Sequence, residues 1–131
     1  MGTTLSNNVA DALESIHFNF DLTYYISGPM SGYPEFNYPA FKQAAIDLAE
    51  QEVRTINPTD CFPNDKPGSR TYTEYLRAAF RMLLSADGII MLRGWPESKG
   101  ARTEIEIAMD LNFPVYYYAD GVLVSMNQEN P

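Results

Sequence analysis

Glu104 occupies a position where the helical pattern of the sequence favours an apolar side chain. It stands with Ile107, Ala108 and Leu111 at the i, i+3, i+4, i+7 spacing of a core-facing stripe, whereas Glu106 falls on the polar side of the same helix. A carboxylate at the head of such a stripe, shortly after a glycine, is placed to hold its charge in a partly dry crevice. From there it can attack a substrate as a nucleophile. The alternative is a buried structural carboxylate that accepts hydrogen bonds from amides of a neighbouring loop.

Three other features could contact a ligand. The segment 28–32 (Gly-Pro-Met-Ser-Gly) follows a predicted strand, and its glycines let the backbone approach a ligand closely, although a tight strand-to-helix turn explains them equally well. It matches neither the Walker nor the dinucleotide-binding pattern. Asp87 stands at a strand entry, where an aspartate more often bonds loop amides than takes part in catalysis. Trp95 either stacks on a base or packs beneath its own loop.

These groups need a scaffold, and the chain alternates between strand and helix patterns. Runs of aromatic and β-branched residues predict the strands, and apolar residues at helical spacing predict the helices between them. The predicted strands are 22–27, 53–57, 89–92, 115–118 and a short fifth at 121–124, and the predicted helices are 38–52, 73–85 and 98–111. Thr73 and Ser98 are expected to cap the second and third helices.

This alternation predicts an α/β fold with a parallel sheet of four or five strands, covered by helices on both faces in a small three-layer sandwich. In such folds a ligand binds beyond the carboxyl ends of the strands. The loops 28–34, 57–72 and 93–98 are expected at that edge, and Glu104 follows the last of them by about one helical turn.

The 131 residues predict one domain at 22–126, preceded by an extension (1–21) with a short helix from Asn8 to Ile16 and followed by a polar tail (127–131). A net charge of −8 argues against binding to nucleic acid polymers or anionic membranes, and no apolar run is long enough to span a bilayer. One cysteine and one histidine exclude an internal disulfide and a cysteine or histidine metal cluster. A cytoplasmic protein is expected.

Three segments carry a resemblance to a known family. They are Tyr25-Ile26-Ser27-Gly28-Pro29-Met30 after the first strand pattern, Ala86-Asp87-Gly88-Ile89-Ile90 at the central strand entry, and 98–108 (Ser-Lys-Gly-Ala-Arg-Thr-Glu-Ile-Glu-Ile-Ala) at the last helix. In order and spacing, across residues 22–118, they resemble the nucleoside 2-deoxyribosyltransferase-like superfamily. The segment 94–101 (Gly-Trp-Pro-Glu-Ser-Lys-Gly-Ala) is most similar to a small bacterial and phage branch that is DUF4406-like.

The resemblance implies a Rossmann-like (flavodoxin-like) fold, a homo-oligomer, no metal or cofactor, and a nucleoside or nucleotide as the partner. It implies cleavage or transfer at the N-glycosidic bond of a 2-deoxyribonucleoside or its 5-monophosphate. Glu104 would attack the anomeric carbon, and a second base or water would resolve the deoxyribosyl-enzyme. Tyr25 matches a family tyrosine that orients this glutamate. The residues that match substrate-binding positions are Ser27, Gly28, Pro29, Met30, Asp87, Trp95, Ser98 and Gly100.

One departure from the family pattern concerns the leaving base. Relatives carry an aspartate two helical turns before the Ala86-Asp87 pair, where it protonates or holds the base, and the residue here is Ala79. Loss of a general acid costs about 10²–10⁴ in rate. The acid could come from elsewhere, with Asp60, Asp65 and Glu74 as candidates, or the leaving base needs little help.

A second departure concerns phosphate. The superfamily's nucleotide hydrolases have serine and arginine in the first loop, where this chain has Pro29 and Ser31. Other side chains that could reach a phosphate are Arg77, Arg93, Arg102 and Ser125. Three functions therefore stay open: an enzyme that uses Glu104, a catalytically weak nucleotide-binding protein on the same fold, and a structural or interaction module.

Overall fold

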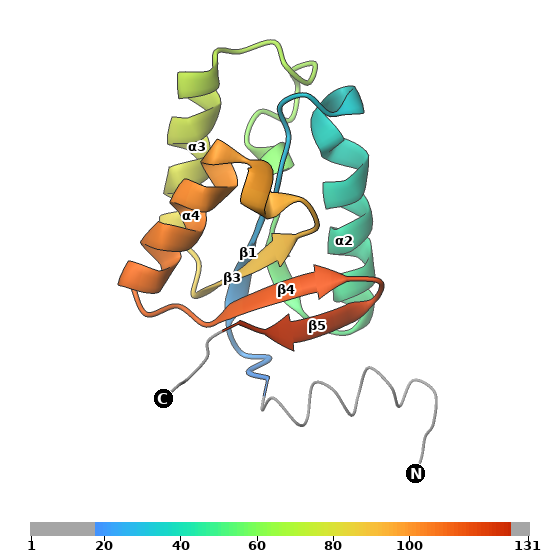
Figure 1. Ribbon diagram of the computed structural model, residues 1–131. Coiled ribbons are helices and arrows are strands. Elements are labelled where there is room, and N and C mark those ends of the chain that lie inside the picture. Colours follow the sequence, from blue (N-terminus) through green and yellow to red (C-terminus); the bar gives the residue numbers. More distant parts are fainter. Residues whose placement is uncertain (1–17, 127–131) are drawn as a thin grey trace.

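Strands and helices alternate along the chain much as the sequence patterns predict. The computed structural model describes residues 18–126, which form a mixed α/β fold with a five-stranded sheet and three α-helices (Figure 1). The strands are β1 (Thr23–Ser27), β2 (Arg54–Ile56), β3 (Gly88–Leu92), β4 (Val115–Ala119) and β5 (Val122–Ser125), and the helices are α2 (Tyr38–Glu50), α3 (Tyr72–Leu84) and α4 (Lys99–Asp110). The predicted short helix in the N-terminal extension and the polar tail lie outside the described residues.

The sheet has the strand order β2-β1-β3-β4-β5, and its first four strands are parallel. Tyr25 marks the register, since it pairs with Ile56 on β2 and with Ile89 on β3. The central pair, β1 and β3, is therefore flanked on both sides. Within the described part of the chain, none of the helices has the length and apolar content needed to cross a membrane.

The fifth strand corrects one prediction, because β5 pairs with β4 in the antiparallel direction. Ala119 and Val122 are register partners, so only Asp120 and Gly121 form the connection. Their φ angles are 55° and 79°, and a two-residue hairpin turn with both central residues at positive φ fits the twist of the flanking strands. The Asp-Gly pair was the sequence signal for this hairpin.

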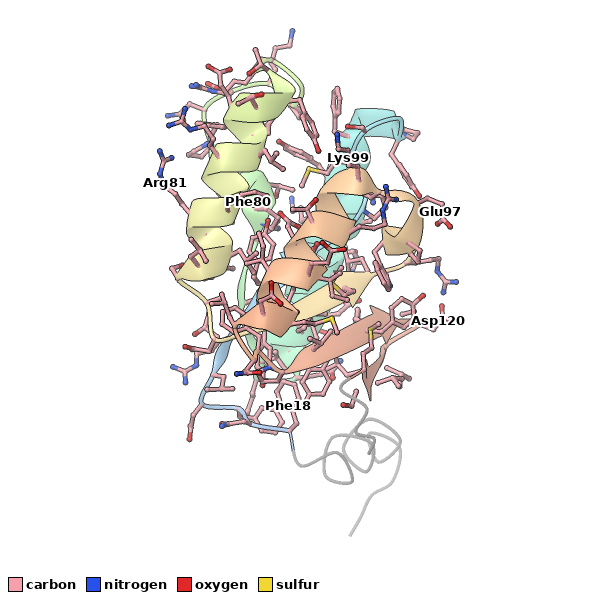
Figure 2. All side chains as sticks on the ribbon, turned by 60° about the vertical axis from the view of Figure 1, so that its left-hand side comes forward. Phe18, Phe80, Arg81, Glu97, Lys99 and Asp120 are labelled. Atoms are coloured by element: carbon pink, nitrogen blue, oxygen red, sulfur yellow. The ribbon has the colours of Figure 1, made fainter. Side chains whose placement is uncertain are left out.

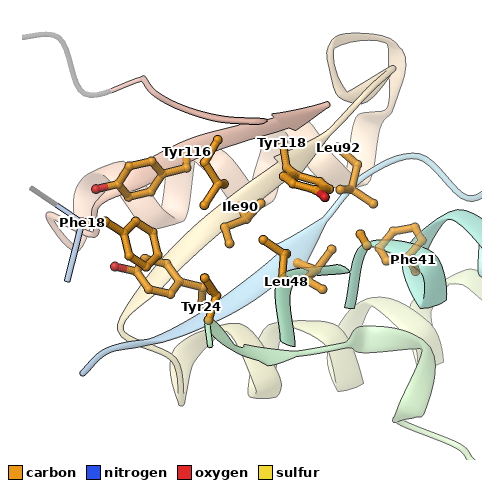
Figure 3. Close-up of a cluster of buried hydrophobic side chains, with 12 residues drawn as sticks. Phe18, Tyr24, Phe41, Leu48, Ile90, Leu92, Tyr116 and Tyr118 are labelled. Carbon is orange, nitrogen blue, oxygen red and sulfur yellow. The ribbon is translucent and has the colours of Figure 1, made fainter. Parts of the chain in front are cut away.

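The side chains of β1 alternate between the two faces of the sheet, as the period of two in a strand requires. Tyr24 and Ile26 belong to an apolar cluster with Phe41 and Leu48 of α2 (Figure 3). Tyr25 belongs to a second cluster, on the other side, with residues of α3 and α4. In Figure 1, α3 and α4 lie next to each other on one side of β1, and α2 lies on the other.

Two helix starts test the predicted caps. Ser98 caps α4 as expected, and its hydroxyl accepts from the Ala101 N–H at 3.2 Å. The predicted cap of α3 is wrong by two residues, because Thr71 caps that helix instead of Thr73. Thr71 and Glu74 exchange side-chain-to-backbone hydrogen bonds in a capping box, whose Thr-x-x-Glu spacing is the better signal.

Candidate active site

Glu104 lies on the buried side of α4, with 6% of its surface exposed. The buried residues of this helix are Ala101, Glu104, Ile105 and Ala108, so the apolar stripe begins one turn earlier than predicted and Glu104 stands inside it. Leu111, expected in the stripe, is 46% exposed because it follows the last turn of the helix. The predicted burial of the carboxylate is confirmed.

Two hydroxyl groups from β1 hold the Glu104 carboxylate. Tyr25 Oη donates to Glu104 Oε2 at 2.7 Å, and Ser27 Oγ donates to Oε1 at 2.5 Å. Tyr25 and Ser27 are two positions apart on the strand, so both side chains point to the face that α4 covers. Each carboxylate oxygen thus has one fixed donor, and each keeps further lone-pair capacity for a substrate.

The charge state of Glu104 is set by two opposing effects. Burial raises the pKa of Glu104 from 4.5 to about 7, while the hydrogen bonds from Ser27 and Tyr25 lower it. The pKa of Tyr25 is well above its ordinary value, because of burial and then the neighbouring Glu104, so this phenol stays protonated and donates. Near neutral pH the site therefore holds a carboxyl group that ionises readily but is poorly solvated.

Glu104 opens onto a cavity of about 410 Å³ beyond the carboxyl end of β1. The predicted site residues that line it together are Tyr25, Gly28, Pro29, Met30, Ser98, Gly100 and Glu104. Gly28 keeps this wall close to the sheet, because a Cβ there would lie only 3.0 Å from Leu92 Cβ and 3.4 Å from Phe41 Cζ. Ser27 does not line the cavity. Ser27 has only 1% of its surface exposed, and it contributes to the site through its hydrogen bond to Glu104.

The structure separates two predicted site residues from this cavity. Asp87 is exposed at the opposite, amino end of the sheet, where its carboxylate accepts from Thr23 N–H at 3.0 Å and its own N–H donates to Thr23 O at 2.8 Å. This is the structural alternative that the strand-entry position suggested. Trp95 faces a separate depression with Tyr117, Val124 and Met126. It packs against the second apolar cluster, the one that contains Tyr25.

Sequence reasoning missed the aromatic lining of the cavity. Its members come from the loop after β1, from α2 and from α3, and they are Tyr33, Phe36, Tyr38, Phe41, Tyr72 and Tyr75. A partial signal was present, since Tyr72, Tyr75, Leu76 and Ala79 have the spacing of one helix face and all four line the cavity. Sequence spacing cannot show that this face overlooks Glu104.

The expected position of the missing acid does lie at the cavity, because Ala79 is part of its wall. None of the substitutes named from the sequence lines the cavity. Asp65 pairs with Arg70 at 2.5 Å, Glu74 serves the α3 capping box, and Asp60 lies in the short turn Pro58–Asp60. The carboxylates of the wall are Glu97 and Glu104.

The cations of the wall are Arg70 and Lys99, rather than those that the sequence suggested for a phosphate. Arg93 bonds Asp120 at 3.0 Å and Arg102 bonds the Pro96 carbonyl at 2.9 Å. In Figure 2, Lys99 and Glu97 lie by the amino end of α4, and Asp120 lies away from it. Among residues 18–126, no group of three or more histidine, cysteine, aspartate or glutamate side chains could hold a metal ion.

The fold and the cavity define a mixed α/β protein with a buried carboxyl group at the carboxyl end of its sheet. Residues 22–117 match the model of a family described as a domain of unknown function, DUF4406. The match runs from just before β1 into β4, so the chain belongs to this family. No curated protein shows a significant match to the chain. Membership in a family without an assigned function supplies no activity.

Proposed function

We propose that this protein cleaves or transfers at the N-glycosidic bond of 2-deoxyribonucleosides or their 5-monophosphates, through a covalent deoxyribosyl intermediate on Glu104. The observation that carries the proposal is the Glu104 carboxyl group, buried, held by two hydroxyl donors and open to a cavity of about 410 Å³. Sites for small ligands typically measure about 300–1,000 Å³. Aromatic side chains in the wall suit the flat faces of a base.

The chemistry follows from what each side chain of the site can do. Ionised Glu104 attacks the anomeric carbon as the bond to the base breaks, and its charge stabilises the oxocarbenium-like transition state. Tyr25 and Ser27 fix both carboxylate oxygens and favour the ionised form that the attack requires. A second base or water then attacks the same carbon and releases Glu104. Because α4 and β1 are rigid elements, positioning contributes to the rate.

The finer class of the fold belongs to the same proposal. The order β2-β1-β3-β4-β5 is that of flavodoxin-like doubly wound sheets, and the cavity lies beyond the carboxyl ends of β1 and β3, the pair at which the strand order reverses. We therefore infer a Rossmann-like (flavodoxin-like) three-layer sandwich. We infer a homo-oligomer from the resemblance alone, and a cytoplasmic location from the composition.

One observation favours a second candidate, a nucleotide-binding protein with little catalysis. The cavity wall has Ala79 where relatives place the acid for the leaving base, and Asp60, Asp65 and Glu74 do not line the cavity. Without a donor of any kind, the rate would fall by about 10²–10⁴. Binding would persist, because the aromatic wall and the amino end of α4 do not depend on this acid.

The deciding experiment incubates the protein with each 2-deoxyribonucleoside and each 5-monophosphate and measures free base by chromatography. Base release that Glu104→Ala abolishes supports the enzyme, and adding a second base distinguishes transfer from hydrolysis. Tight binding without release, measured by calorimetry, supports the second candidate. Binding of none of these compounds would contradict both and leave an interaction module.

The substitution Ala79→Asp tests the missing acid. We expect it to raise turnover by about 10-fold or more, because it places a carboxyl group on the α3 face that lines the cavity. Arg77→Asp is a matched control, since Arg77 lies on the exposed side of the same helix and does not line the cavity. Equal turnover in wild type and Ala79→Asp would mean that residue 79 is not at the acid position.

A further inference from the structure

The cavity wall carries tyrosine hydroxyls in two groups, which we call its two ends: Tyr33 with Tyr72, and Tyr38 with Tyr75. At one end, a Cβ on Gly94 would lie 2.7 Å from Tyr33 Oη and a Cβ on Gly100 would lie 3.7 Å from Tyr72 Oη. Both hydroxyls therefore lie near the segment that leads into α4. This end also carries Ser98 and Lys99, so it suits the sugar or phosphate part of a ligand rather than a base.

The other end holds Tyr38 of α2, Tyr75 of α3 and Cys61. All three line the cavity, and burial raises the pKa of Tyr38, with smaller contributions from the Tyr75 hydroxyl and the Cys61 thiol. Tyr25, which donates to Glu104, lines the same cavity. Ala79 also lines the cavity, one helical turn after Tyr75 on the same face of α3, so Tyr75 lies next to the position of the missing acid.

Both phenols of this end are suited to donate. The Tyr75 oxygen accepts from the Arg70 N–H at 3.3 Å, which leaves its own proton to donate elsewhere, and Phe62 packs edge-on against its ring. Tyr38 is the first residue of α2. Burial favours the neutral, donating form of its phenol.

We propose that the Tyr38 and Tyr75 hydroxyls donate hydrogen bonds to the departing base, in place of the carboxylic acid that Ala79 lacks. This inference rests on the proposed function. As Glu104 Oε bonds to the anomeric carbon, the carbon–nitrogen bond breaks and its electron pair stays on the base nitrogen. The base leaves as an anion held by two O–H donors, and it takes a proton from water after release. Neither tyrosine needs to lose its proton.

The experiment compares two leaving groups. A 2-deoxyribonucleoside needs donors for its departing base, whereas 4-nitrophenyl 2-deoxyribofuranoside releases a stable anion without them. We expect Tyr38→Phe and Tyr75→Phe each to lower kcat/KM for the nucleoside by roughly 10-fold or more, and the double variant to lower it further. The same variants should change kcat/KM for the nitrophenyl substrate by less than about 3-fold.

Two further variants complete the test. Tyr72→Phe is the matched control, since it removes a cavity hydroxyl from the other end, and it should not change the ratio between the two substrates. Ala79→Asp added to Tyr38→Phe/Tyr75→Phe should restore cleavage of the nucleoside, because a carboxylic acid then replaces the phenols. If the double variant does not fold, the two single variants give the same comparison.

The outcomes separate this inference from the proposed function. Equal losses on both substrates, or no loss on the nucleoside, would overturn the role of the two phenols while Glu104-dependent cleavage stands. Cleavage of neither substrate by the wild-type protein, or cleavage that survives Glu104→Ala, would overturn the proposed function itself.

Discussion

Glu104 and Asp87 are carboxylates at opposite ends of the same sheet, and their surroundings differ sharply. Glu104 is almost fully buried, accepts from two side-chain hydroxyls and faces a cavity. Asp87 is exposed, accepts from a backbone N–H and joins the starts of β1 and β3. One carboxylate is held where its charge is disfavoured, and the other is held where water satisfies it.

This contrast follows from the geometry of a parallel sheet. At the amino end, the Asp87 contacts join the starts of two neighbouring strands. At the carboxyl end, the chain leaves β1, β2 and β3 through loops that diverge before they reach the next helix, and a cavity opens between them. A reactive carboxylate is therefore expected at the carboxyl end and a structural one at the amino end.

The largest effect is expected from Glu104→Gln, which keeps the shape of the side chain and removes the nucleophile. We expect base release to fall by about 10⁴-fold or more, because an amide cannot form the glycosyl ester. The measurement is base release by chromatography, with circular dichroism as the folding control. Turnover within 10-fold of wild type would mean that Glu104 is a structural residue like Asp87.

The same variant should change how stability depends on pH. Because the folded state raises the pKa of Glu104 to about 7, it holds a proton that the unfolded state has released above about 4.5. The free energy of unfolding of the wild type should therefore fall, relative to that of Glu104→Gln, as pH rises through this range. The shift corresponds to about 3 kcal/mol, fully developed above pH 7.

Urea unfolding of both proteins at pH 4 and pH 8 measures this difference. The two proteins should differ by about 3 kcal/mol more at pH 8 than at pH 4, with Glu104→Gln gaining at the higher pH. A difference that does not change with pH would show that Glu104 does not carry the raised pKa.

Removing one hydroxyl donor should bring a smaller effect at the carboxyl end. Tyr25→Phe leaves Glu104 Oε2 without its donor, so the ionised form becomes less favourable and the pKa of Glu104 rises. We expect kcat/KM to fall by roughly 10-fold at neutral pH and the acidic limb of the pH–rate profile to move to higher pH. Ser27→Ala should act in the same direction through Oε1. A lower rate with an unmoved limb would indicate lost packing instead.

The smallest effect is expected at the amino end. Asp87→Ala removes the acceptor of the Thr23 N–H and should cost about 1 kcal/mol of stability, while turnover changes by less than about 2-fold. Asp87→Asn keeps an acceptor oxygen and should recover part of the loss. A large drop in turnover with an unchanged melting temperature would show that Asp87 takes part in catalysis.

Much of the local structure was predictable from the residues alone. The helical spacing around Glu104 identified a carboxylate on a buried face, and Ser98 identified the start of its helix. The alternation of strand and helix patterns predicted the mixed α/β fold. These features depend on neighbours within a few positions, where periodicity and capping chemistry act directly.

The direction of β5 and the cap of α3 were predicted wrongly, although the sequence contains a local signal for each. The Asp120-Gly121 turn makes β5 antiparallel, although alternation along the rest of the chain suggested a parallel strand. Thr71, not Thr73, caps α3, because only Thr71 has a glutamate three positions later.

The sequence by itself determined that a glutamate of this chain sits where its charge is difficult to solvate. Only the tertiary structure decided what surrounds it: Tyr25 and Ser27 from β1 hold the carboxylate across 79 and 77 positions of sequence. It also placed Ala79 and the Tyr38–Tyr75 pair in the same cavity and kept Asp87 and Trp95 out of it. Helical and strand periods show which side chains share a face. Which faces meet, and at which end of the sheet, depends on packing between elements that lie far apart in the chain.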